Sequence, residues 1–364
     1  MYKKIDKSII VLVFIFMIIS VITIYSAEKI VDSSNYYFIK QLLWYLIGFI
    51  IAFYISNINL DRVYEKAYVF YIISNILLLL LLIFGSPINE SKCWFKISGI
   101  GTIQPSEFVK IALIILIANE CCNFKKKYIN PSWKDELKFL LKIILLIIPP
   151  SILTFLEPDT GVVLIYLVIT ITILFTSGIR YRWFILLTII ITCILTTILT
   201  IYFFNKNLFI NIFGNSFFLR INRLLDWSNK SGYQLTNSLI SIGSSGVFGR
   251  LFNNNLYIPE AHTDFIFAVL ASSFGIIGSL LIIILIVIFD IKIINIGLHT
   301  KKIADKFTIS GIAGMLTYQQ FQNISMTIGL MPITGITLPF ISYGGSSLLS
   351  YMIILGLILN ISRN

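Results

Sequence analysis

The residues best suited to chemistry lie at the mouth of an uncharged apolar run. The stretch PEAHTDFIF, residues 259–267, holds Glu260, His262 and Asp264, and His262 is one of only 2 histidines in the chain. Side chains of these types transfer protons in active sites. A carboxylate at this position can also simply cap the helix that follows. Asp264 therefore has two interpretations, a reactive group or an N-cap.

A second candidate is the charged pair in QPSEFVK, residues 104–110. Pro105 and Ser106 would open a helix, with Ser106 as its cap. Glu107 and Lys110 are then three positions apart on one helix face. They could form a local ion pair, but Lys110 lies inside an apolar span, where an ionisable group is a candidate for function by default.

Two other patches offer a carboxylate and a pair of arginines. Asp159 in EPDTG is either a functional carboxylate or the cap of the next helix. In NSFFLRINRLLDWSNK, apolar residues alternate with Arg220 and Arg223, which suits a helix lying in the headgroup region. Arginines at that depth could bind a phosphate. A second amphipathic stretch covers 232–251. The glycines of SYGGSS match no nucleotide-binding fingerprint, which favours a plain turn there.

The elements that must hold these residues are membrane-spanning helices. Hydrophobic residues make up 57% of the 364 residues and charged residues only 12%, about half the charged share of a soluble protein. A spanning helix needs roughly 20 apolar residues. Stretches that meet or approach this length occur ten times: 8–26, 37–56, 67–85, 106–122, 138–156, 160–178, 183–204, 265–289, 307–330 and 344–361.

Lysine and arginine in the loops indicate the orientation. With a cytoplasmic N-terminus, the inner segments carry 17 of these residues and the short outer loops carry four, as the positive-inside rule requires. We therefore predict an all-α polytopic membrane protein with ten transmembrane helices, both termini cytoplasmic, and a large extracytoplasmic loop, 205–264, between helices seven and eight. The net charge of +11 then reflects topology and gives no indication of nucleic-acid binding. Only Cys93 lies in an outer loop, so no disulfide framework is predicted.

Taken together, the motifs resemble the SEDS family (shape, elongation, division and sporulation), the group of RodA, FtsW and SpoVE. The resemblance rests on YSA at 25–27, Trp94 followed by QPSEFVK, EPDTG, GYQ at 232–234, PEAHTDFIFAV, and PITGITLPFISYGGSSLL at 332–349. It implies one membrane domain over residues 1–364, in the bacterial plasma membrane. It also implies a peptidoglycan glycosyltransferase that polymerises lipid II at the outer face and works with a class B penicillin-binding protein.

The resemblance implies roles for single residues as well. Asp264 aligns with the family's essential acidic residue and would be the base, or a ligand to a divalent cation, Mg²⁺ or Mn²⁺, that bridges to pyrophosphate. Trp94 would pack against a sugar or the lipid stem. The cationic candidates for the pyrophosphate are Lys110, Arg220, Arg223 and Arg250. The other substrate-binding candidates are Glu107, Asp159 and His262.

Some positions depart from the family pattern. Ser272 and Ser273 stand where the family has two acidic residues, Cys93 replaces an arginine before Trp94, and GRL at 249–251 replaces GKG. These departures keep an inactive scaffold for the penicillin-binding protein open as a rival function, and a lipid II flippase is the other. YYFIKQLLW and NISMTIGLMPITGI are more typical of RodA, and PEAHTDFIF of FtsW or SpoVE. The balance slightly favours RodA and an elongation role.

Overall fold

The fold is a bundle of long helices, described here from a computed structural model. It covers residues 6–31, 36–88, 91–97, 101–215, 217–218, 221, 232–251 and 257–363. Within these residues, seven helices are long and apolar enough to cross a membrane. A helix covers each predicted apolar stretch: α1 (Lys7–Val31), α2 (Tyr37–Ser56), α4 (Ala67–Phe84), α5 (Pro105–Lys127), α6 (Trp133–Leu156), α7 (Thr160–Thr176), α8 (Tyr181–Phe204), α12 (Ile266–His299), α13 (Ile303–Thr327) and α14 (Gly345–Arg363).

The predominantly helical bundle agrees with the all-α prediction, and one loop adds a small sheet that was not predicted. The loop between α4 and α5 contains a three-stranded antiparallel sheet in the order β1-β2-β3. Its strands are β1 (Ser86–Ile88), β2 (Ser91–Ile97) and β3 (Gly101–Ile103), and Trp94 pairs with Ser86 across the sheet. β2 contains Trp94, Phe95 and Ile97, which are residue types that favour pleated strands.

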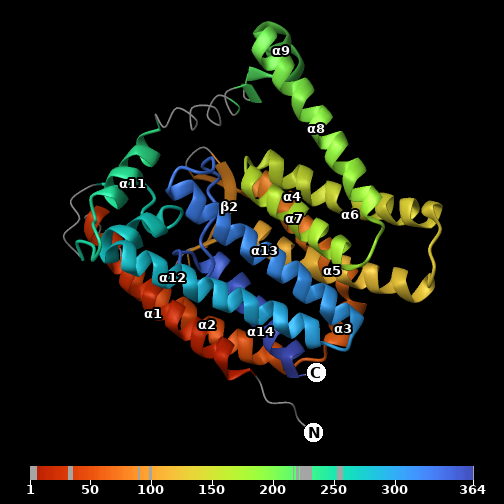
Figure 1. The fold of residues 1–364 in the computed structure, drawn as a ribbon, viewed down its shortest axis with the longest axis horizontal. Helices are drawn as coiled ribbons and strands as arrows, with labels where there is room; N and C mark the ends of the chain where they lie inside the picture. The colour runs from red at the N-terminus through yellow and green to blue at the C-terminus, as the bar shows by residue number, and fades with distance from the viewer. Residues whose placement is uncertain are drawn as a thin grey trace.

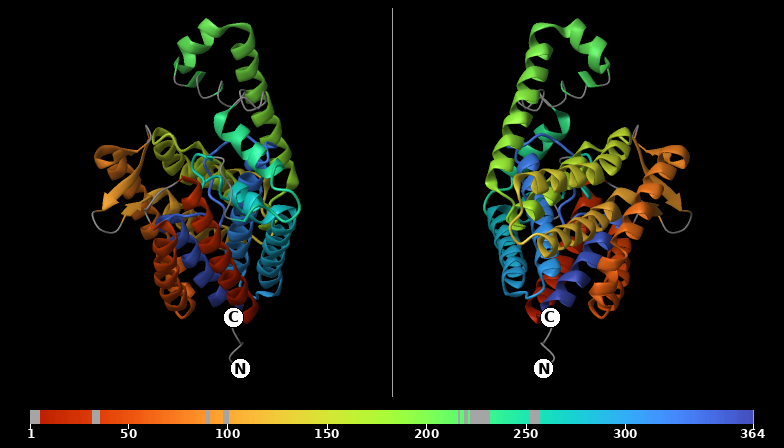
Figure 2. Two further views of the ribbon diagram at one scale, coloured as in Figure 1. Left: turned by 90° about the vertical axis from the view of Figure 1, so that its left-hand side faces the viewer. Right: turned by 90° about the vertical axis from the view of Figure 1, so that its right-hand side faces the viewer.

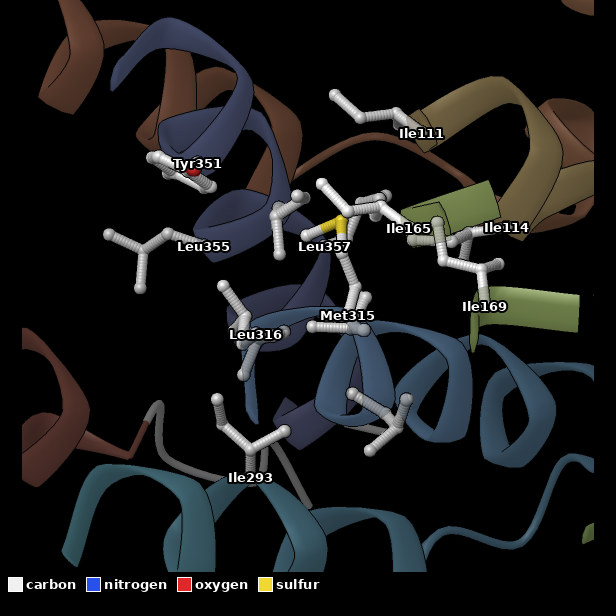
Figure 3. Packing of buried hydrophobic residues seen from close by; sticks show 14 of the residues in the cluster. Ile111, Ile114, Ile165, Ile169, Ile293, Met315, Leu316, Tyr351, Leu355 and Leu357 are labelled. Atoms are coloured by element: carbon white, nitrogen blue, oxygen red, sulfur yellow. The ribbon is translucent and has the colours of Figure 1, made fainter. Parts of the chain in front are cut away.

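The core lies where α5, α7, α12, α13 and α14 meet (Figure 3). Ile114 of α5, Ile165 of α7, Met315 of α13 and Leu355 of α14 are all at most 1% exposed and belong to one cluster. α8 is the opposite case, because none of its residues is buried. It leaves the bundle and rises towards α9 (Lys206–Phe213) (Figure 1). A helix with apolar residues on all its faces is either enclosed by protein or surrounded by lipid. Much of α5 is enclosed by protein.

The two ends of the described chain lie at the same end of the bundle (Figure 2). Polar contacts hold the last turn of α14 against the end of α2. Asn360 Nδ2 donates to the carbonyls of Ile55 and Ile58, and Arg363 donates to the carbonyl of Ser56. At the same end lie α3 (Leu60–Glu65) and the start of α13, where the Tyr64 hydroxyl donates to Asp305 over 2.9 Å.

The segment 205–264 contains more helix than a plain connector would. The predicted second amphipathic stretch forms α11 (Tyr233–Gly243), which ends earlier than expected. Most of the predicted first stretch, including Arg220 and Arg223, lies outside the described residues. The described part of that stretch contributes Phe218 and Ile221 to a small apolar cluster with Phe209 of α9.

α12 is broken at Gly275, where φ is 68° and the helix loses its regular geometry. Backbone groups on both sides of the break pair with the segment 246–251. Arg250 and Leu251 donate to the carbonyls of Ser272 and Ser273, and Ile276 and Ile277 donate to the carbonyls of Gly246 and Val247. The break is therefore closed by hydrogen bonds that an uninterrupted helix would have made internally.

Candidate active site

The backbone around Asp264 is held by the segment between α13 and α14. Tyr343 N–H donates to the carbonyl of His262 over 2.8 Å, and Ser342 Oγ donates to that of Thr263 over 2.7 Å. Asn323 Nδ2 of α13 donates to the carbonyl of Asp264 over 2.9 Å. Three successive carbonyls are thus fixed by one neighbouring region, which leaves the Asp264 side chain partly exposed on a rigid turn.

Asp264 is not the cap of α12. The N-cap position belongs to Phe265, and no side chain makes a cap hydrogen bond there. The interpretation of Asp264 as an N-cap is therefore wrong. Its pKa is raised to about 7, mainly by burial and to a smaller extent by the neighbouring negative charges of Glu260 and Asp159. A carboxyl with such a pKa is divided between acid and base forms at neutral pH, which suits proton transfer.

Asp159 is the N-cap of α7, which confirms the interpretation of this residue as a helix cap. Its Oδ1 accepts from Val162 N–H over 3.1 Å, and its Oδ2 accepts from Gln104 Nε2 over 2.8 Å. Its pKa is about 6, raised mainly by burial and held down by the Val162 hydrogen bond.

The predicted cap of α5 is wrong, because the N-cap is Gln104 rather than Ser106. Pro105 occupies the first helical position, so the helix begins two residues earlier than a Ser106 cap would allow.

Glu107 and Lys110 form a buried ion pair with an N···O distance of 2.7 Å. Lys110 is 0% exposed, and its ammonium also lies 5.5 Å from the centre of the Tyr351 ring. Ser350 Oγ of α14 donates to Glu107 Oε2 over 2.9 Å. The pair therefore joins α5 to α14 from inside the bundle, beneath Asp159, instead of lying on the surface.

The segment 334–336 links the two halves of the site. A Cβ at Gly161 would lie 2.7 Å from the Thr334 carbonyl oxygen, so the start of α7 packs directly on this backbone. On the other side, a Cβ at Gly335 would lie 3.5 Å from Asp264 Oδ2. Segments distant in sequence thus meet around Asp159 and Asp264. The negative charge of Glu107 contributes to the raised pKa of Asp159, and those of Glu260 and Asp159 contribute to the raised pKa of Asp264.

His262 and Trp94 lie at the border of this cluster. The His262 ring stacks on Tyr37 of α2 with centroids 4.6 Å apart and planes 8° apart. Burial lowers the pKa of His262, and the nearby Glu260 opposes this shift. The Cys93 thiol lies 2.8 Å from the carbonyl of Glu157. Because side chains alternate along a strand, the Trp94 side chain points to the opposite face of the sheet from Cys93.

Arg250 is held away from the carboxylates. Its Nε donates to the carbonyl of Ser244 over 3.0 Å, and its backbone pairs with the break in α12. The side chain is exposed. Ser272 and Ser273 are fully buried beside that break, where they bond to the Val269 carbonyl and to Ser26 Oγ. Each serine hydroxyl that replaces a family carboxylate thus has a partner inside the protein.

Several residues of the site were not predicted from the sequence. Gln104, Asn323 and Tyr37 orient Asp159, Asp264 and His262 respectively. Glu157 is a fourth, a fully buried carboxylate at the end of α6. Its only sequence signal is an acidic residue directly after an apolar span, in the same motif as Asp159.

The described side chains do not form a complete metal site by themselves. In the described part of the chain, no three His, Cys, Asp or Glu side chains lie close enough to form a metal site. Mg²⁺ is often bound by one or two carboxylates and the phosphates of a substrate. The partly exposed carboxylate of Asp264 fits that smaller ligand set.

Comparison with known proteins places these features in a family. A family model described as "Cell cycle protein", FtsW/RodA/SpoVE, matches residues 6–364. The chain is 33% identical to a probable peptidoglycan glycosyltransferase FtsW from Coxiella burnetii, covering 98% of this chain and 96% of that protein. It is 30% identical to stage V sporulation protein E of Bacillus subtilis, covering 98% and 97%.

Two solved structures share the fold over nearly the full length. One comes from work on the structural coordination of polymerization and crosslinking by a peptidoglycan synthase complex. It has a TM-score of 0.82 and 26% identity, and the match covers 99% of this chain and 98% of that chain. The other is the rod shape determining protein RodA of Thermus thermophilus, with a TM-score of 0.70, 26% identity and coverage of 99% and 97%.

Proposed function

The chain belongs to the FtsW/RodA/SpoVE family of cell-cycle proteins, and on that premise we propose that it is a peptidoglycan glycosyltransferase. Its substrate is lipid II, which it polymerises into glycan strands at the outer face of the bacterial plasma membrane. The names of its relatives support the activity, and its apolar helices support the location. The observation that carries the proposal is the carboxylate of Asp264, which is not used as a cap and lies on a turn whose backbone carbonyls are held by three hydrogen bonds.

The proposed topology has ten crossings with both termini in the cytoplasm. Beyond the seven clearly apolar helices, α5, α7 and α13 would also cross. α7 is apolar but short, and α5 and α13 carry the buried polar residues of the site. The segment 205–264 would then lie outside, on the same side as Asp264 and Asp159.

In the proposed reaction, Asp264 acts as the general base. The acceptor sugar hydroxyl gives its proton to the Asp264 carboxylate while its oxygen bonds to the anomeric carbon of the donor. The bond from that carbon to the diphosphate oxygen breaks, and the electron pair leaves with the diphosphate. Because the donor linkage is α and the polymer linkage is β, one inverting displacement is sufficient and no covalent enzyme intermediate is needed.

The other predicted residues have supporting roles in this proposal. Asp264 would also hold a divalent cation, Mg²⁺ or Mn²⁺, which when bound offsets the negative charge of the leaving diphosphate. Lys110 keeps Glu107 and the base of the site in place. Asp159 orients the start of α7, and His262 the turn that carries Asp264. Trp94 and the cationic residues Arg220, Arg223 and Arg250 would contact the substrate outside this cluster.

An apolar layer in the core favours this function over transport. The buried polar residues of α13 fall into two groups, Asp305 and Thr308 near one end and the stretch from Gln319 near the other. Between them the buried positions are Ile309, Ile312, Met315 and Leu316. Seven residues of helix span about 10 Å, so a flippase would have to open this layer to move a polar headgroup.

The proposed partner is a class B penicillin-binding protein. The similarity to a chain of a synthase complex that couples polymerization to crosslinking supports an assembly of this kind. The polymerase would supply glycan strands that the transpeptidase crosslinks. Whether the pair serves elongation, division or sporulation is a separate question, which complementation of strains that lack each relative would answer.

Reconstitution tests the proposal directly. The protein is purified with its co-encoded penicillin-binding protein and given lipid II and Mg²⁺ or Mn²⁺, next to an Asp264→Asn variant. The matched control is Asp61→Asn, which alters an exposed aspartate paired with Lys302 far from the site. We expect a ladder of glycan chains from the wild type and the control but not from Asp264→Asn. A ladder from Asp264→Asn would overturn the assignment of the base, and no ladder from an intact wild-type complex would favour a scaffold.

A further inference from the structure

Glu157 is a buried carboxyl without a partner of its own. The residue is 0% exposed, and neither of its carboxyl oxygens has a hydrogen-bond partner among the described residues. Its backbone N–H closes the last turn of α6 by donating to the Leu153 carbonyl, and its own carbonyl is in contact with the Cys93 thiol. The backbone is therefore secured, while the side chain points into the protein with no compensating donor.

If Glu107, Asp159 and Glu157 were all ionised, this cluster would hold more negative than positive charge. Lys110 is the one cation that acts on this cluster in the described structure, and it pairs with Glu107 at 2.7 Å. Asp159 and Glu157 then remain without an ion pair. A buried charge without a counter-charge is costly, so one of the two is expected to keep its proton.

The helix ends decide which carboxyl keeps the proton. Asp159 is the N-cap of α7 and accepts hydrogen bonds from Val162 N–H and Gln104 Nε2. Glu157 is the C-cap of α6, where the free carbonyls make the potential negative. Helix N-termini stabilise anions and C-termini destabilise them. Asp159 is therefore the ionised member, and Glu157 is the member that keeps the proton.

We propose that Glu157 is a positioning residue that works as a neutral carboxylic acid. By staying neutral it halves the uncompensated negative charge of the Asp159–Glu157 pair and permits the anionic diphosphate of a lipid-linked donor to bind nearby. The proposal of a diphosphate donor rests on the function proposed above, whereas the protonation of Glu157 does not. The titratable and charged groups that act on Glu157 or share its buried cluster are Asp159 and Tyr166 of α7, Glu107 and Lys110 of α5, and Cys93 of β2.

The direction of its titration agrees with this role. The pKa of Glu157 is raised to about 8, mainly by burial and to a smaller extent by the negative charge of Asp159. The pKa of Asp159 is about 6. At neutral pH the pair thus holds one proton, mostly on Glu157, and it loses that proton as the pH rises through about 8.

Infrared spectroscopy tests the protonation without any need for activity. The wild type, Glu157→Gln and the control Glu65→Gln, which alters an exposed glutamate at the end of α3, are titrated from acid to alkaline pH. We expect a protonated-carboxyl band that fades as the pH rises through about 8, is present in the control and is missing in Glu157→Gln. Identical spectra for the wild type and Glu157→Gln would overturn the proposal, even if the protein proved to have no polymerase activity.

Kinetics with lipid II test the consequence. If only the protonated form binds donor well, the apparent KM of the wild type rises about tenfold per pH unit above the pKa, in proportion to the lost competent fraction. We expect Glu157→Gln to keep kcat at neutral pH and to remove that alkaline rise in KM. An alkaline rise in KM that persists in Glu157→Gln would contradict the role of Glu157 as a neutral acid. So would a loss of kcat at neutral pH in a folded Glu157→Gln protein. A wild type without activity would instead count against the proposed function alone.

Discussion

Asp264 combines a fixed backbone with a carboxyl whose pKa is near neutral. The hydrogen bonds to the carbonyls of residues 262–264 come from α13 and from the segment between α13 and α14, so the turn that carries Asp264 cannot rotate freely. Burial of the side chain raises its pKa to about 7. A base poised near the working pH combines a sufficient ionised fraction with a useful driving force for proton transfer.

The pH dependence of activity follows from this value. The base must be ionised, so kcat/KM is expected to fall as the pH drops through about 7 and to approach a tenfold loss per pH unit below it. The measurement is the initial rate of glycan synthesis from lipid II at subsaturating concentration, between pH 5 and 8. An acid limb near the ordinary aspartate pKa would show that Asp264 is not the base.

Asp264 should also reduce stability at alkaline pH. Its pKa is higher in the folded protein than in the unfolded chain, so folding binds protons and stability is lost as the pH rises from about 4 to 7. The substitution Asp264→Asn removes this effect. We expect the variant to unfold at a higher temperature than the wild type at pH 8 and at a similar temperature at pH 4, as followed by thermal unfolding in detergent.

The Glu107–Lys110 pair offers a comparison of buried and exposed charges. Lys110→Met leaves Glu107 buried without its counter-charge, which is expected to cost about 3–5 kcal/mol. The double variant Glu107→Gln/Lys110→Met should cost less than the sum of the single changes. Lys302→Met is the matched control, since it breaks an exposed pair with Asp61 and should cost about 0–1 kcal/mol. Equal losses at both sites, measured by denaturant unfolding, would contradict the buried-pair assignment.

At the scale of elements, the break in α12 ties the segment 246–251 to the bundle. Gly275 and Gly249 both have positive φ, and each would place a Cβ within 3.0 Å of the other segment's backbone. Glycine is required at both positions for that close approach. Since α12 also begins directly after Asp264, the break connects the large loop to the element that carries the site.

Substitution at the break should separate this contact from general helix effects. Gly275→Ala is expected to destabilise the protein by about 1–3 kcal/mol, because alanine is strained at positive φ and its Cβ meets backbone atoms. Gly243→Ala is the control, since a Cβ there meets nothing within 4 Å. The readouts are the unfolding midpoint and glycan synthesis. A Gly275→Ala variant as stable as Gly243→Ala would show that the two segments do not meet in solution.

At the scale of the whole molecule, the bundle places its polar chemistry and its chain ends at opposite ends. The first and last helices are tied together at one end by Asn360 and Arg363, and α8 carries α9 away from that end (Figure 1). α8 buries no residue, so lipid or another protein must cover it in a membrane. This arrangement is what the proposed topology requires.

Cysteine labelling in cells tests that topology. In a background with Cys193→Ser, single cysteines are introduced as Tyr257→Cys and Lys301→Cys, at positions that are both exposed. We expect a membrane-impermeant thiol reagent to label position 257 in intact cells and position 301 only after permeabilisation. The reverse pattern would invert the orientation and place Asp264 in the cytoplasm.

Apolar length and loop charge were sufficient to locate the helices, because a helix in lipid must satisfy its own backbone and therefore needs an uninterrupted apolar stretch. Each of the predicted stretches is helical. Asp159 as a cap and the pairing of Glu107 with Lys110 were also predictable, since both depend on residues a few positions apart. The small sheet was missed because short strands depend on their partner strands more than on local pattern.

Tertiary structure alone decided which distant groups meet. The contacts that hold Asp264 come from Asn323, Ser342 and Tyr343, all more than fifty residues away in the chain. The break in α12 and the buried, unpartnered state of Glu157 likewise depend on packing between elements. The physical reason is the same in each case: burial and electrostatic potential depend on neighbours in space, and a sequence pattern records neighbours only along the chain.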